Sequence, residues 1–162
     1  MKLIQANQDG YGFEFTRREK QLLFKVLALY PLIPAAHHRL SRTAGRNGEE
    51  NQTLLEESLA THREEARRRA QTLMDNPRGF EARGAAFCWT PTRDEMEWML
   101  QVLNDVRVGS WLALGSPNLT KTQEIPVTPD TLIHRWAMDI AGGFEMIFIA
   151  AVNGELPKQA GG

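Results

Sequence analysis

Two predicted helices near the C-terminus carry the polar side chains whose types and spacing could do chemistry. The cluster consists of Asn104, Asp105, Arg107, His134, Arg135 and Asp139. A carboxylate or imidazole in such a group could act as an acid or base whose pKa is set by its neighbours. No Ser, Cys or Lys accompanies the group as a nucleophile, and no glycine-rich phosphate loop follows a predicted strand. The same residues could instead form a buried ionic network that only fixes how the two helices align.

The partners of these charges depend on how the two helices align. If they lie antiparallel with their adjoining ends level, Asp105 is level with Asp139. Arg107 with Asp139, and Arg135 with Asp105, are then the expected cross-helix ion pairs. This alignment predicts that the cluster comes together as one group.

Glycines in the same helices predict close packing between them. In this alignment Gly109 faces Trp136, while Gly142 and Gly143 face Trp98. Each helix then offers small residues where the other offers bulky ones. Glycine inside a helix costs roughly 1 kcal/mol relative to alanine, so a packing role is a reason to keep it.

The last helix is expected to position the cluster. Thr128 is suited to be its N-cap, Pro129 its first residue, and Asp130 favours the positive end of the helix dipole. Apolar residues then follow around nearly the whole circumference up to Val152, which predicts a central, buried helix.

Three further helices are predicted from capping and periodicity. Residues 16 and 19, and again 92 and 95, form Thr-x-x-Glu capping boxes that start helices ending near 30 and at 114. The segment 51–74 has an apolar stripe that includes His62, expected to be half-buried. Its charges are spaced for Glu64–Arg68 and Glu65–Arg69 pairs.

The remaining segments complete an expected single domain over 1–162. They are a β-hairpin at 1–16, a flexible basic loop at 35–50, an apolar extended connector at 80–89 and a frayed tail at 153–162. Together these elements predict a mainly α fold, a helical bundle of four to five helices with a small N-terminal β-hairpin.

Charge and composition bound the class of function. The chain has 162 residues, 42% of them hydrophobic, with a formal net charge of -1. Residues 1–85 carry 14 Lys and Arg against 11 Asp and Glu, whereas residues 86–162 carry 5 against 9. Nucleic-acid binding, through Arg39, Arg42, Arg46 and the run 67–69, would call for a much stronger basic excess. The charge balance therefore argues against nucleic-acid binding as the function.

The sequence also gives little support for a metal site, a reactive cysteine or a membrane-spanning segment. Cys88 is the single cysteine and lies between Phe87 and Trp89, which predicts a buried, unreactive side chain. His37 and His38 lack a spaced third ligand, so no metal or other cofactor is expected. The chain shows neither a signal peptide nor an apolar run long enough to span a bilayer, and we expect a cytoplasmic protein.

Two short motifs in the second half of the chain carry a family resemblance. The run Leu103–Arg107 (LNDVR), followed by Leu112–Gly115 (LALG), resembles a pattern of the bacterial domain of unknown function 2017 (DUF2017) family. This chain departs from that pattern by inserting residues 108–111 and by its long loop at 35–50, so it would be a divergent member. The resemblance implies a predominantly helical cytoplasmic regulator or adaptor with protein partners, and it carries no catalytic residues over.

The expected function is a non-enzymatic cytoplasmic interaction or regulatory protein, with an adaptor as one form of that role. Four tryptophans and a largely apolar last helix offer more apolar surface than such a bundle easily buries, which predicts a protein partner or a homodimer. The alternative is a small-ligand-binding module or enzyme that uses Asp105, Arg107, His134 and Asp139.

Overall fold

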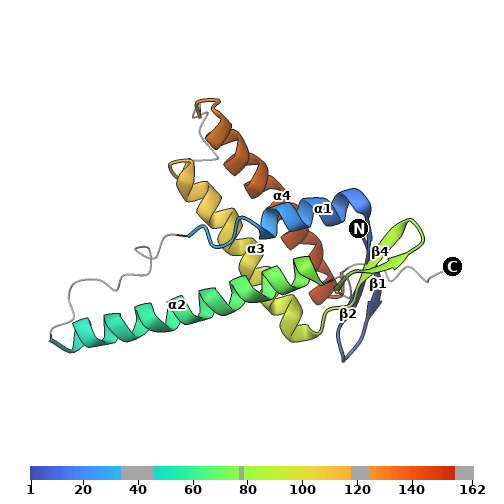
Figure 1. Ribbon diagram of the computed structural model, residues 1–162, viewed down its shortest axis with the longest axis horizontal. Coiled ribbons are helices and arrows are strands. Elements are labelled where there is room, and N and C mark those ends of the chain that lie inside the picture. Colours follow the sequence, from blue (N-terminus) through green and yellow to red (C-terminus); the bar gives the residue numbers. More distant parts are fainter. Residues whose placement is uncertain (34–45, 77–78, 118–124, 156–162) are drawn as a thin grey trace.

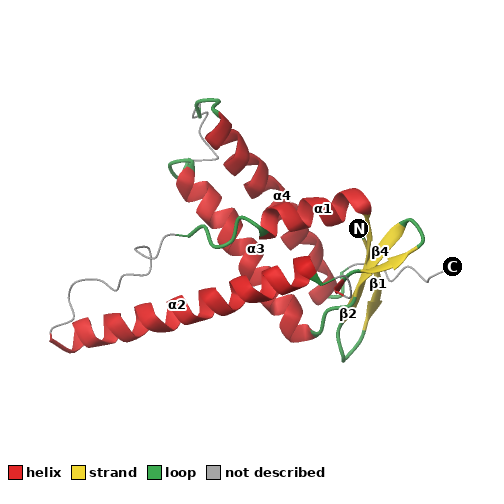
Figure 2. Ribbon diagram, viewed as in Figure 1, coloured by secondary structure: helices red, strands yellow, loops and turns green. Residues whose placement is uncertain are grey.

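The computed structural model describes residues 1–33, 46–76, 79–117 and 125–155, and these ranges contain four strands and four helices. The strands are β1 (Lys2–Ala6), β2 (Tyr11–Thr16), β3 (Glu81–Arg83) and β4 (Ala86–Trp89). The helices are α1 (Arg17–Leu27), α2 (Arg46–Asp75), α3 (Arg93–Ala113) and α4 (Pro129–Val152). Figure 2 shows the strands gathered at one end of the molecule.

The strands form one antiparallel sheet in the order β1-β2-β4-β3, so the fold is mixed α/β. The prediction of a mainly α bundle with only a small hairpin was wrong. The segment 80–89, expected only as an extended connector, is a second hairpin whose strand β4 pairs with β2. Gly84, with a φ of 62°, makes the tight turn between β3 and β4. A short apolar run does not reveal by periodicity alone that a distant strand pairs with it.

The hairpin predicted at 1–16 is confirmed as β1 and β2. The Asn7 side-chain oxygen accepts the backbone N–H of Gly10 at 3.0 Å and so closes the turn. Gly10 also lies tightly against the segment before α3, since an added Cβ would be 2.3 Å from the carbonyl oxygen of Pro91. The N–H of Tyr11 donates to that same oxygen at 2.9 Å. The turn is therefore tied to the start of α3.

The predicted helix starts are confirmed at three places. Thr16, Thr92 and Thr128 are the N-caps of α1, α3 and α4. The charged helix is longer than expected, because α2 begins at residue 46 and so takes up the end of the predicted loop at 35–50. The rest of that loop, 35–45, and the end of the predicted tail, 156–162, lie outside the described residues. His62 is exposed, contrary to the prediction that it is half-buried.

The hydrophobic core lies where the sheet meets α1, α3 and α4. Phe13 and Phe15 of β2 are fully buried, and the Phe13 ring packs edge-on against Phe148 of α4 with centroids 5.1 Å apart. Trp89 of β4 lies 5.7 Å from the same Phe148 ring. Cys88 is buried as predicted, at 3% exposure. Figure 1 shows α1 crossing the antiparallel pair α3 and α4, while the N-terminal part of α2 projects beyond the other elements.

Only one side of α4 is buried, so the prediction of a central helix buried all round was wrong. The buried residues of α4 are Ala137, Ala141, Phe144, Glu145, Phe148 and Ala151. Helices α3 and α1 pack against this helix, and its opposite side is open to solvent. A helix that is apolar all round must be buried, but the sequence does not say whether the same chain or another one covers it.

Candidate functional site

Asp105 binds the backbone of the segment after α1 and not the other residues of the predicted cluster. Its carboxylate is buried, 9% exposed, and accepts the backbone N–H groups of Leu32 at 2.7 Å and Ile33 at 3.2 Å. Arg63 of α2 donates to the Ile33 carbonyl oxygen at 2.7 Å. Burial, together with the negative charge of Asp105, raises the pKa of Tyr30. Asp105 thus fastens the segment that follows α1 onto α3.

Arg107 has a different partner from the one predicted. Its guanidinium donates to the Glu145 carboxylate at 2.6 Å and to the Asn104 side-chain oxygen at 2.7 Å. The expected Arg107–Asp139 pair does not form. The assumption that the ends of α3 and α4 are level was wrong by roughly one to two helical turns, because Arg107 lies beside Gly142 and Glu145 instead. The length of the α3–α4 connection did not determine this register.

The other three predicted residues, all on α4, differ in exposure and in their contacts with the described residues. Arg135 and Asp139 are exposed, and neither forms an ion pair with another described residue, so the predicted Arg135–Asp105 pair is also wrong. His134 is half-buried, and its Nδ1 has no hydrogen-bond partner among the described residues. The structure therefore brings Asn104 and Arg107 together, places Asp105 and His134 in separate surroundings, and leaves Arg135 and Asp139 exposed on α4.

The predicted glycine contacts were also wrong in detail. A Cβ at Gly109 would lie 2.4 Å from the Cβ of Leu32, so this glycine accommodates the segment after α1 and not Trp136. Gly142 lies near the Arg107 side chain, with 3.5 Å between its added Cβ and the Arg107 Cδ. A Cβ at Gly143 would meet nothing within 4 Å. Gly143 therefore faces open space.

The open side of α4 is the most apolar exposed surface of the described chain. Of the seven large hydrophobic residues that are exposed in the described ranges, five belong to α4 and a sixth, Val127, lies just before its N-cap. Met146 is 68% exposed and Leu132 is 51% exposed. We call this surface the outer face of α4 and define it by residues spaced three or four apart: Leu132, Arg135, Asp139, Gly143, Met146 and Ile149. An exposed apolar face of this kind is a candidate contact site.

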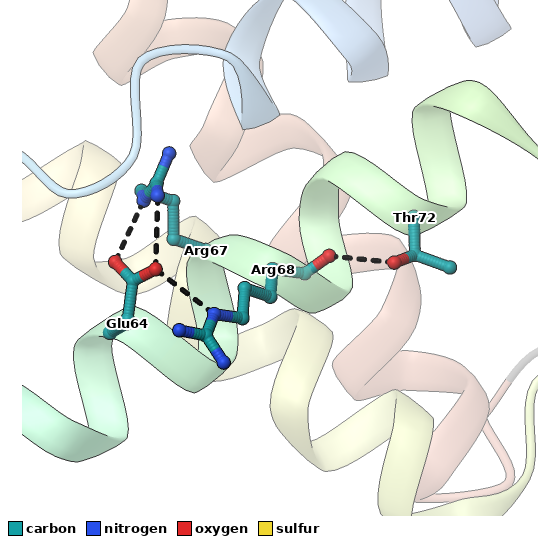
Figure 3. Close-up of polar contacts among 4 residues, drawn as sticks. All are labelled: Glu64, Arg67, Arg68 and Thr72. Carbon is teal, nitrogen blue, oxygen red and sulfur yellow. Dashed lines mark hydrogen bonds and ion pairs between the residues drawn. The ribbon is translucent and has the colours of Figure 1, made fainter.

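A groove of about 650 Å³ between α2 and the start of α3 is a concave feature of the described residues that could take a ligand. Arg68 borders it and Trp98 lines it. Figure 3 shows that Glu64 binds both Arg67, at 3.0 Å, and Arg68, at 3.1 Å. These two guanidinium groups lower the pKa of Glu64 to about 2. Because Arg68 already has a carboxylate partner, the groove supports a binding function less than the outer face of α4.

Glu145 makes the ion pair between α3 and α4 sensitive to pH. Burial raises the pKa of this carboxyl above its ordinary value of 4.5, although Arg107 opposes the shift. The folded chain then binds a proton more tightly than the unfolded chain, so stability falls as pH rises from 4.5 through the raised pKa. We expect the Glu145→Gln variant to lack this loss. Urea unfolding of the wild type and the variant, below and above pH 4.5, measures the loss of stability. A difference in unfolding free energy between the two proteins that stays the same at both pH values would contradict the expectation.

The described residues form neither a metal site nor a membrane-spanning helix. No three His, Cys, Asp or Glu side chains of these ranges lie close enough together to hold a metal ion. None of the helices there combines the length and the hydropathy needed to cross a bilayer.

No family model, no curated protein and no solved structure matches this chain. The resemblance to the DUF2017 family therefore depends on the short motifs of α3, and the function has to be inferred from the residues of this chain.

Proposed function

We propose that this protein is a non-enzymatic cytoplasmic interaction or regulatory protein that presents the outer face of α4 to a protein partner. The observation that carries the proposal is the exposure of Met146, Leu132 and Ile149 along one side of a helix whose other side is in the core. Exposed large apolar side chains gathered on one face, with polar groups among them, are characteristic of protein contact sites.

The form of the surface supports a helical contact. The exposed apolar side chains lie at the two ends of the face, Leu132 at one end and Met146 with Ile149 at the other, and such side chains on one side of a helix can dock it against a groove or another helix. The charges of Arg135 and Asp139 lie within this face and would select among partners by charge complementarity. An adaptor, which the DUF2017 resemblance implies, is one role that such a face could serve.

The alternative, a ligand-binding module or enzyme built on the predicted polar cluster, receives less support. Asp105 is occupied by two backbone N–H groups, and Arg107 is occupied by Glu145 and Asn104. Asp139 lies exposed on the outer face of α4. The residues that this function would need therefore do not share one set of surroundings.

Site-specific photo-crosslinking tests the proposal. A benzophenone amino acid placed at Met146 is expected to form a covalent product with a defined polypeptide in extracts of the source cells. The same group placed at Gln101, an exposed position on α3, is the matched control and is expected to give no such product. Absence of a product at position 146, or identical products at both positions, would count against the outer face as the interaction surface.

A further inference from the structure

We propose that the partner on the outer face of α4 is a second copy of this chain, docked antiparallel so that Arg135 of each copy pairs with Asp139 of the other. This inference rests on the proposed function and names its partner. It follows from the order of charges and of large and small residues along α4, which is complementary to itself when the helix is reversed.

The charges require an antiparallel arrangement. Arg135 and Asp139 are one helical turn apart, both exposed, and without an ion-pair partner among the described residues. In a two-fold arrangement with parallel helices, each charge would face its own copy and repel it. A two-fold axis at the level of Ala137 with the helices antiparallel brings each Arg135 opposite an Asp139 and makes two equivalent ion pairs.

The same axis also matches large residues with small ones. It places Leu132, 51% exposed, over Gly142 and Gly143 of the other copy. A Cβ at Gly143 would meet nothing within 4 Å, so there is space for the incoming leucine side chain. Large residues opposite small ones let two helices approach closely.

The flanks of this contact are apolar in both copies. Val127, 74% exposed, lies just before α4 and comes level with the partner's Met146 and Ile149, which are 68% and 47% exposed. Because the arrangement is two-fold, this contact occurs once on each side of the charge pairs. The dimer contact would thus cover three of the five exposed large hydrophobic residues of α4, Leu132, Met146 and Ile149.

Sedimentation velocity of the purified full chain over the micromolar range tests the inference. We expect a dimer of two 18.3 kDa chains. Arg135→Asp and Asp139→Arg, each tested alone, are expected to weaken the dimer by about tenfold or more, because each replaces both attractive pairs with repulsive ones. Glu97→Arg, an exposed charge reversal on α3, is the matched control and should leave the dimer unchanged.

The decisive arm mixes the two weakened variants in equal amounts. In a mixed dimer, position 135 of the Arg135→Asp chain faces position 139 of the Asp139→Arg chain, and both pairs become attractive again. The mixture should therefore dimerise about tenfold more tightly than either variant alone. The double variant R135D/D139R should likewise recover the wild-type affinity. A mixture no tighter than its components overturns the antiparallel pairing.

The outcome also separates this inference from the proposed function. A wild-type chain that stays monomeric overturns the second-copy inference, and a crosslink from position 146 to a different polypeptide would then leave the proposed function standing. A dimer that Met146→Asp does not weaken also overturns the second-copy inference, because its interface lies elsewhere, whereas the proposed function is overturned only by the crosslinking result at position 146. Unchanged circular dichroism of each variant shows that loss of association is not loss of folding.

Discussion

The Asp105→Ala substitution is expected to lower the free energy of unfolding by about 3 kcal/mol, because two backbone donors lose a charged acceptor at once. Asp105 accepts the N–H of Leu32 at 2.7 Å and that of Ile33 at 3.2 Å, and its own side chain is buried. Hydrogen bonds to a charged group are stronger than neutral ones, and unpaired buried donors are costly. Urea unfolding measures the loss.

Asp105→Asn is the matched control for this prediction. The amide keeps an oxygen acceptor but loses the charge, so we expect a loss of no more than about half that of alanine. The pKa of Tyr30 gives a second readout, since burial and the Asp105 charge raise it. Spectrophotometric titration should show a lower Tyr30 pKa in the Asn variant. Equal stability of the wild type and the alanine variant would show that Asp105 does not hold the segment after α1.

Gly109→Ala is expected to destabilise the protein by about 1 to 3 kcal/mol, even though alanine favours a helix over glycine. An added Cβ would lie 2.4 Å from the Leu32 Cβ, 2.8 Å from the Leu32 carbonyl carbon and 2.9 Å from the Ile33 nitrogen. Two of these atoms belong to the backbone, so a change of side-chain rotamer cannot relieve the contact. Thermal and urea unfolding measure the effect.

Gly143→Ala is the control that isolates this clash. An added Cβ at Gly143 meets nothing within 4 Å, so only helix propensity acts and we expect stabilisation of up to roughly 1 kcal/mol. The measurement is made in dilute solution so that dimerisation does not contribute. If both variants were stabilised, the segment after α1 would not lie against Gly109 as described.

The interactions that could be predicted from the sequence are those within a few residues along the chain. The N-caps Thr16, Thr92 and Thr128 bond residues three positions away, so their signals are complete in the local sequence. The first hairpin was predictable for the same reason, because its turn joins two neighbouring strands. The buried state of Cys88 follows from its apolar neighbours.

The tertiary structure alone determines which distant segments meet. The pairing of β4 with β2, the partnership of Arg107 with Glu145 and the bonds of Asp105 to Leu32 and Ile33 each join distant parts of the chain. Many registers of two apolar helices are compatible with one hydrophobic pattern, so the pattern alone does not select one. The outer face of α4 stays open because α1, α3 and the sheet pack only against the opposite side of this helix. The sequence alone does not determine this, because the same apolar pattern is found whether the same chain or another one covers the helix.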